Sequence, residues 1–275
     1  VITKMRDDEI NAYFRSKSAF TITKNIPARD FGMAEWRTIF TDGSVIPREG
    51  YDIFYSGEWA NKVPVIIGCT KDEMKLFGWF RKDPPLNTRE YDLVWKYHSM
   101  LWRANGVDEV VNKMTSRSDV PVYVYRFDWG SMDENGNSVL PGNKGRDFGA
   151  HHAAEIPFFL GMGKVDLALL TGKTHSEHNR LGREKLTNLC MSYLANFAKS
   201  GNPNHEDLPN WPVWDNSEEL DKVIVLDAGI DDLRISYLKE TITTQNVIEL
   251  VDSELEEPER GYVKALLDDF IPLRK

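Results

Sequence analysis

Two short apolar runs, each followed at once by ionisable side chains, set the strongest limits on how this 275-residue chain can fold. The first, VPVIIGCTKDE at residues 63–73, is apolar and β-branched over its first five positions, turns at Gly68 and leads into the helix-like sequence MKLFGWF. This order predicts a buried strand, a turn and a helix start. Asp72 and Glu73 then fall at the C-terminal edge of a sheet, where open α/β sheets bind ligands. The alternative is that either carboxylate only complements the helix N-terminus.

The second apolar run leads to a pair of histidines. PVYVYRFDWG at residues 121–130 alternates Val, Tyr and Phe in a way typical of strand interiors. A loop rich in Gly and Asn then brings in His151 and His152. Histidine is the usual general base because its pKa lies near neutrality, and its other ring nitrogen needs an acceptor that fixes the tautomer. An upstream carboxylate can supply that acceptor, so the two segments together indicate an acid and a base.

Five stretches follow one another along the chain: TDGSVIP, VPVIIGCTKDEMKLF, YVYRFDW, GAHHAAEIPFFLG, and FAKSGNPN with WPVW after it. In this order they resemble the type-B carboxylesterases, a family that includes the cholinesterases. The resemblance implies an α/β fold, namely the C-terminal portion of an α/β-hydrolase fold with a mostly parallel central sheet flanked by helices. It also implies that residues 1–275 are the C-terminal half of a single catalytic domain.

The resemblance assigns candidate catalytic residues to positions in this sequence. The triad acid falls on Glu73 and the triad histidine on His152. In the family a glutamate follows the histidine by three residues, and Glu155 keeps that spacing from His152 but not from His151. His151 replaces a usually apolar residue, so it is either a wall of the site or a packed neighbour. Glu155 is expected to be structural, as a hydrogen-bonding anchor for the histidine loop.

The nucleophile of such a triad is a serine on a Gly-x-Ser-x-Gly elbow that precedes the acid and the histidine. No such sequence occurs in the 275 residues, and Ser44 and Ser138 lie in loops without the pair of flanking glycines that the motif requires. The resemblance therefore implies a Ser-His-Glu carboxylesterase for small-molecule esters, in which the N-terminal half of the same esterase supplies the serine and the oxyanion hole. Two alternatives remain: a non-catalytic cholinesterase-like binding or adhesion domain, and a pseudo-esterase.

Composition excludes some classes of protein. The net charge of −9 argues against nucleic acid, because binding phosphates requires clustered Lys and Arg. The sequence has neither a run of about 18 apolar residues nor a basic-then-apolar leader, so we expect no membrane span. Cys69 and Cys190 sit in apolar surroundings and are expected to be buried free thiols. Extracellular animal members of the family that the sequence resembles are disulfide-bonded, so this resemblance implies a microbial protein of a reducing compartment, with a cytoplasmic location as the expectation.

No metal or organic cofactor is expected. The pairs His175 with His178, and His152 with Glu155, have spacings that one helical turn could use to hold a metal. No third and fourth ligands converge on either pair at a recognisable spacing, so neither is interpreted as a metal site. His175 and His178 are expected to be an exposed polar helix start.

The remaining pattern predicts further elements. Helices are expected over residues 7–16, 88–114 and 183–200, the last with Gly201 as its cap, followed by a last short strand over 222–227 and an acidic tail. Four tryptophans near the candidate site in sequence could line an acyl or alcohol pocket or form ordinary core. They are Trp79, Trp95, Trp102 and Trp129.

Overall fold

The computed structural model describes residues 4–26, 41–162 and 174–270. The chain divides into two compact units, Val1–Arg48 and Glu49–Lys275. The smaller unit contains α1 (Asp7–Arg15), the helix expected near the start, and α2 (Ala19–Thr23). Neither helix buries a side chain. All the elements described below belong to the larger unit.

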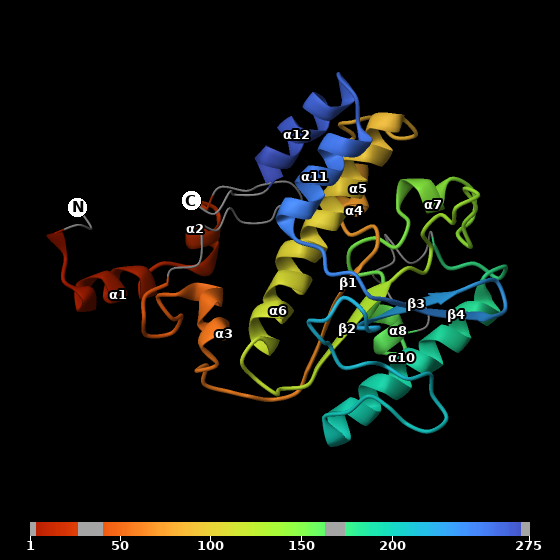
Figure 1. Cartoon of the computed structure of the whole chain (residues 1–275). Coiled ribbons are helices and arrows are strands. Elements are labelled where there is room, and N and C mark those ends of the chain that lie inside the picture. The colour runs from red at the N-terminus through yellow and green to blue at the C-terminus, as the bar shows by residue number, and fades with distance from the viewer. Residues whose placement is uncertain (1–3, 27–40, 163–173, 271–275) are drawn as a thin grey trace. The chain divides into compact units, whose positions relative to one another are not determined.

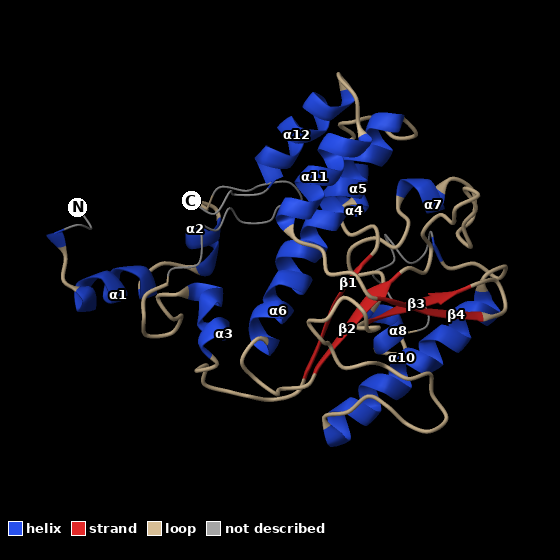
Figure 2. Ribbon diagram, viewed as in Figure 1, coloured by secondary structure: helices blue, strands red, loops and turns tan. Residues whose placement is uncertain are grey.

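The larger unit is built on a four-stranded sheet with strands in the order β1-β2-β3-β4. The first three strands run parallel, and β4 pairs antiparallel with β3. This mixed, mostly parallel sheet is visible in Figure 2 and confirms the α/β class expected from the sequence. The strands are β1 (Val65–Thr70), β2 (Val122–Phe127), β3 (Val223–Ala228) and β4 (Leu233–Leu238).

Helices cover the sheet and extend the unit beyond it, as Figure 1 shows. The larger unit begins with a 3-10 turn, η3 (Gly50–Asp52). A π-helix, η4 (Ala104–Asp108), joins the helix before it, α5, to the helix after it, α6. The elements are η3 (Gly50–Asp52), α3 (Ile53–Ser56), α4 (Lys75–Arg81), α5 (Arg89–Arg103), η4 (Ala104–Asp108), α6 (Glu109–Thr115), α7 (Lys144–Asp147), α8 (Ile156–Phe159), α10 (Arg180–Ser200), α11 (Thr244–Glu254) and α12 (Glu259–Phe270). None of the described helices is long and apolar enough to span a membrane.

Both faces of the sheet are covered by apolar clusters, because successive side chains of a strand point to opposite faces. On β2, Tyr123 and Phe127 pack in a cluster with residues of α8 and α10. Val122 and Val124 point to the opposite face and pack with residues of η4 and α6. Because side chains alternate along a strand, these two sets must lie on opposite faces, and a sheet covered on both faces is typical of parallel strands. A third apolar cluster joins α5 to α11 and α12.

The expectation of a turn at Gly68 is wrong, because β1 continues to Thr70 and the turn comes after that residue. Gly68 lies directly opposite Tyr125 in the parallel register. A Cβ atom at residue 68 would overlap the Tyr125 ring. The glycine therefore leaves room for a large neighbour within the strand, a use that sequence alone does not distinguish from a turn.

The strand over 222–227 was expected to be the last one, and this is also wrong. β4 (Leu233–Leu238) follows it at the sheet edge, and most of its side chains are partly or fully exposed. An edge strand buries little apolar surface, so its sequence carries a weak periodic signal. The region expected to be an acidic tail forms α11 and α12, which pack on α5 through their apolar faces.

The other expected helices are confirmed with small changes. Residues 88–114 form α5 and α6, but the π-helix η4 separates them. The long helix begins three residues earlier than expected, at Arg180, and ends at Ser200. Gly201 adopts φ +73°, the left-handed cap conformation that favours glycine.

Candidate active site

The Glu73 carboxylate is fixed in the turn that follows β1. Its Oε1 accepts a hydrogen bond from the Thr70 backbone N–H at 2.8 Å. The next residue, Met74, donates its backbone N–H to Ser99 Oγ at 3.0 Å, which ties the turn to α5. Glu73 is only 4% exposed. The bond to Oε1 fixes the orientation of the buried carboxylate. Its second oxygen, Oε2, therefore points in a defined direction toward a partner.

That partner is His152, which lies in the loop between α7 and α8. His152 Nδ1 and Glu73 Oε2 are 2.7 Å apart. The same two residues also pair through their backbones, since the His152 N–H donates to the Glu73 carbonyl oxygen at 3.2 Å. A carboxylate accepts hydrogen bonds, so Nδ1 carries the proton and Nε2 is left as the basic nitrogen. The side chain of His152 is 41% exposed, so a reactant can reach it.

The hydrogen bond that His152 donates to Glu73 raises the pKa of His152 above its ordinary value, against the opposing effect of partial burial. A carboxylate at hydrogen-bond distance favours the charged imidazolium. The residue after the histidine, Ala153, has φ +66°, a conformation that a side chain with a Cβ rarely adopts. Strained backbone of this kind collects at functional sites.

Asp72 has a different role from its neighbour Glu73. Its Oδ2 accepts hydrogen bonds from the Ser131 hydroxyl and, at 3.1 Å, from the Ala150 N–H. Its Oδ1 pairs with Lys75 Nζ at 3.0 Å, and its backbone N–H donates to the Ala150 carbonyl at 3.0 Å. Asp72 therefore binds the histidine loop to the turn after β1, whereas Glu73 binds the histidine itself. Neither acts merely as a helix cap.

Gly149 allows the loop to approach Asp72 this closely. It has φ +54°, and a Cβ there would overlap the Asp72 carboxylate. Only glycine combines that backbone conformation with no side chain.

His151 is a packed neighbour, which resolves the alternative left open by the sequence. It is 4% exposed, its Nδ1 lies 2.9 Å from the His152 carbonyl oxygen, and its ring contacts Phe148. Burial lowers the pKa of His151, so the neutral ring is favoured.

Glu155 is buried near the pair. Desolvation raises the pKa of its carboxyl to about 6. Its Oε2 has no hydrogen-bond partner among the described residues, whereas a side-chain hydrogen bond with Tyr125 opposes the rise in the pKa of Glu155. Burial thus moves the protonation of this carboxyl toward the mildly acidic range, above that of an exposed glutamate.

Two aromatic rings stand beside the histidine. Phe77, on α4, has its centroid 5.4 Å from that of the His152 ring, and Trp102, at the end of α5, has its centroid at 5.5 Å. Sequence reasoning did not single out Phe77, although it follows Glu73 by four residues.

The structure separates the four tryptophans considered from the sequence. Trp95 and Trp129 are each 2% exposed and belong to the core. Trp79 packs against Phe148. Of the four tryptophans, Trp102 is the one that contacts the histidine ring.

The serines of the described chain do not complete a triad. Ser131 donates its hydroxyl to Asp72, and Ser138 donates to the Gly130 carbonyl at 2.7 Å. The Ser44 backbone N–H donates a hydrogen bond to the Asp42 carboxylate within a local turn. Across residues 4–26, 41–162 and 174–270, no serine hydroxyl is hydrogen bonded to the His152 ring.

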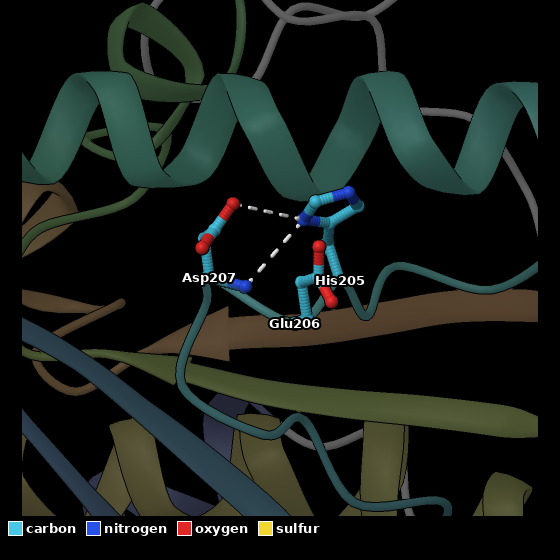
Figure 3. A group of neighbouring side chains, drawn as sticks. All are labelled: His205, Glu206 and Asp207. Carbon is cyan, nitrogen blue, oxygen red and sulfur yellow. Dashed lines mark hydrogen bonds and ion pairs between the residues drawn. The ribbon is translucent and has the colours of Figure 1, made fainter.

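A group with metal-ligand atoms occurs elsewhere, in the exposed turn of His205, Glu206 and Asp207 shown in Figure 3. His205 Nδ1 lies 3.5 Å from Asp207 Oδ2 and 3.4 Å from the Asp207 backbone nitrogen. These contacts stabilise the turn, and exposed acidic groups of this kind are common without a metal. Of the histidines considered as ligands in the sequence, His175 packs against Trp129 and Phe158 instead of lying exposed at a helix start, while His178 is exposed.

A buried glutamate that holds a histidine next to the C-terminal ends of parallel strands is the arrangement that the acid and base of a hydrolase triad require. The profile of the carboxylesterase family matches residues 87–240, more than half of the chain. The chain belongs to the carboxylesterase family.

Two curated relatives show how much of such proteins the chain covers. Rat (Rattus norvegicus) acylcarnitine hydrolase is 33% identical over 133 residues, which are 46% of this chain and 20% of that protein. Mouse (Mus musculus) liver carboxylesterase 1 is 27% identical over 210 residues, 64% of this chain and 35% of that protein. The chain thus spans well under half the length of these relatives. A solved carboxylesterase of Geobacillus stearothermophilus is 23% identical, with 76% of this chain and 43% of that chain covered and a TM-score of 0.48.

Proposed function

We propose that this chain supplies the acid, Glu73, and the base, His152, of a carboxylic ester hydrolase. The observation that carries the proposal is the 2.7 Å contact between Glu73 Oε2 and His152 Nδ1, with the rest of the imidazole accessible. Membership of the carboxylesterase family supports the reaction class. Because the 275 residues hold no Gly-x-Ser-x-Gly sequence, the nucleophilic serine and the oxyanion donors are proposed to come from an N-terminal part of the same esterase.

In the first step, the serine hydroxyl attacks the ester carbonyl while His152 Nε2 takes its proton. Glu73 keeps the proton on Nδ1, orients the ring and stabilises the imidazolium that forms. The negative oxygen of the tetrahedral intermediate is stabilised by donors outside this chain. As the intermediate collapses, the imidazolium returns its proton to the leaving alcohol, and the acyl group stays on the serine.

In the second step, water replaces the alcohol. His152 accepts a proton from the water as it attacks the acyl carbonyl, and the imidazolium then protonates the departing serine oxygen. The products are the carboxylic acid and the regenerated serine. In both steps the proton moves only between His152 Nε2 and the reacting oxygens, so the raised pKa of His152 sets the lower end of the working pH range.

The test is fluorophosphonate labelling, which tags activated serines, together with p-nitrophenyl acetate hydrolysis on the protein and any polypeptide that accompanies it. The proposal expects hydrolysis, and a label on a segment other than these 275 residues. Both should be strongly reduced in the His152→Ala variant. A labelled protein whose His152→Ala variant hydrolyses the ester at the wild-type rate would overturn the assignment. Absence of both label and hydrolysis would favour the binding domain or the pseudo-esterase.

A further inference from the structure

Trp102 lies beside the reactive histidine in an orientation that no core-packing role explains. Its indole is 39% exposed, whereas Trp95, two turns earlier on the same helix, is 2% exposed. The Trp102 and His152 rings meet at an interplanar angle of 70°, with centroids 5.5 Å apart. A large apolar ring that stays accessible next to an accessible imidazole is placed to touch whatever binds there.

The indole is held on a rigid part of α5. Ser99, three residues earlier and so on the same helix face, accepts the Met74 N–H and donates to the Trp95 carbonyl at 2.7 Å. This fixes α5 against the turn that carries Glu73. Trp102 is therefore positioned by the same contacts that position the catalytic acid.

The end of the helix is fixed as well. Arg103 is 4% exposed and donates to Asp108 Oδ1 at 3.2 Å and to the Glu240 carbonyl at 3.0 Å. Asp108 in turn accepts the Ile242 N–H at 2.8 Å. A buried ion pair across the π-helix η4 thus prevents the last turn of α5 from fraying. Side chains on such supported helices define a binding wall better than side chains on loops.

A second ring faces the histidine from another element. Phe77, on α4, meets the His152 ring at an interplanar angle of 43°, with centroids 5.4 Å apart. The imidazole therefore has one ring from α4 and one from α5 beside it. The environment around the reacting nitrogen is apolar on these sides.

We propose that Trp102 is a specificity-determining residue that forms the apolar wall for one substituent of the ester, selecting an aromatic or branched group adjacent to the scissile bond. This inference rests on the proposed function, because it needs the ester at His152. Flat or branched apolar groups gain contact area on an indole face, whereas a methyl or ethyl group gains little. Trp102 should therefore affect selectivity between esters and leave the chemistry itself unchanged.

The test compares wild type with Trp102→Ala and Trp102→Phe in the esterase assembled with its serine-bearing part. Two series of substrates separate the two sides of the ester: the ethyl esters of acetic, isobutyric and benzoic acid, and the ethyl, isobutyl and phenyl esters of acetic acid. We expect Trp102→Ala to lose roughly tenfold or more in kcat/KM for the bulky members of one series. Ethyl acetate should change by less than about twofold. Trp102→Phe should recover most of the loss, because it restores an aromatic wall.

Tyr55→Ala is the matched control, since Tyr55 is an exposed ring on α3 that contacts Lys113 and not the histidine. It should leave both series unchanged. A uniform loss over all esters in Trp102→Ala, no change in either series, or a fall in the yield of assembled enzyme would each overturn the inference. These outcomes are distinct from failure of the proposed function, in which His152→Ala would retain hydrolysis of ethyl acetate.

Discussion

Glu73 and His152 are joined twice, by the 2.7 Å contact between Oε2 and Nδ1 and by the 3.2 Å hydrogen bond from the His152 N–H to the Glu73 carbonyl. The two residues are 79 positions apart in sequence. The backbone bond fixes where the loop sits, and the side-chain bond then fixes the ring plane and the tautomer. The pair is thus pre-oriented before any substrate arrives, as electrostatic preorganisation requires.

The first prediction concerns turnover in the assembled esterase. Glu73→Gln removes the charge that stabilises the imidazolium, and His152→Ala removes the base, so each should lower kcat by about 10³ or more. Steady-state hydrolysis of p-nitrophenyl acetate measures this. His151→Gln is the control, because that buried ring is predicted to pack and not to react. Activity of either triad variant within about tenfold of wild type would contradict the assignment.

The second prediction is the pH dependence of His152. Its folded-state pKa is raised by its hydrogen bond to Glu73, so loss of the base on acidification begins above the ordinary histidine pKa of about 6.5. In Glu73→Gln the midpoint should move to lower pH. Proton NMR titration of the His152 ring measures both values without needing turnover. An unchanged midpoint in the variant would show that the carboxylate does not govern the ring.

The raised pKa of His152 extends the second prediction from catalysis to the pH dependence of folding stability. Because the folded-state pKa of His152 is raised, its contribution is fully present below the unfolded pKa and is lost as the pH rises through the folded value. His151, whose pKa burial lowers, acts in the opposite sense: its contribution is lost as the pH falls. Urea unfolding of His151→Gln at several pH values should therefore show less destabilisation by acid than the wild type.

The third prediction tests Gly149. Alanine there would combine a left-handed backbone with a Cβ that overlaps the Asp72 carboxylate, so Gly149→Ala should lower the free energy of unfolding by about 1–3 kcal/mol. Gly106→Ala is the control, since nothing lies within 4 Å of a Cβ at that position. Urea denaturation of both variants makes the comparison. Equal effects would argue against close packing of the histidine loop on Asp72.

The fourth prediction separates Asp72 from Glu73. Asp72→Ala removes acceptors for Ser131 and Ala150 and leaves Lys75, whose side chain is 10% exposed, without its 3.0 Å partner. Breaking a mostly buried pair should cost about 3 kcal/mol in unfolding free energy. Glu73→Gln keeps the shape of its side chain and should cost less stability while losing more activity. The reverse ranking in urea unfolding would contradict the two roles.

The fifth prediction concerns the two cysteines. Cys69 and Cys190 are buried free thiols, and burial raises the pKa of each well above that of an exposed thiol. Thiolate is the reactive form, so neither should react with Ellman's reagent in the native chain, and both should react in denaturant. Rapid reaction of either thiol under native conditions would show that its region opens.

Local sequence patterns were sufficient for most elements and for the residues of the candidate pair. The apolar runs predicted β1, β2 and β3, and the three-and-four spacing with Gly201 predicted α10, because these signals depend on neighbours along the chain. Glu73 and His152 were assigned through the resemblance to the type-B carboxylesterases, whose motifs this sequence matches at those positions. β4 was missed because an edge strand buries little apolar surface, and Gly68 was misinterpreted because its large neighbour lies on another strand.

The sequence by itself therefore determined the α/β class, the carboxylesterase resemblance and the two ionisable residues at the strand ends. Only the tertiary structure decided which carboxylate reaches the histidine, that His151 is packed while His152 is accessible, and that Trp102 alone of the four tryptophans considered stands beside it. The physical reason is that adjacent residues such as Asp72 and Glu73 share one local pattern. The direction each side chain takes is set by partners some 80 residues away, which are brought close only when the sheet and its loops assemble.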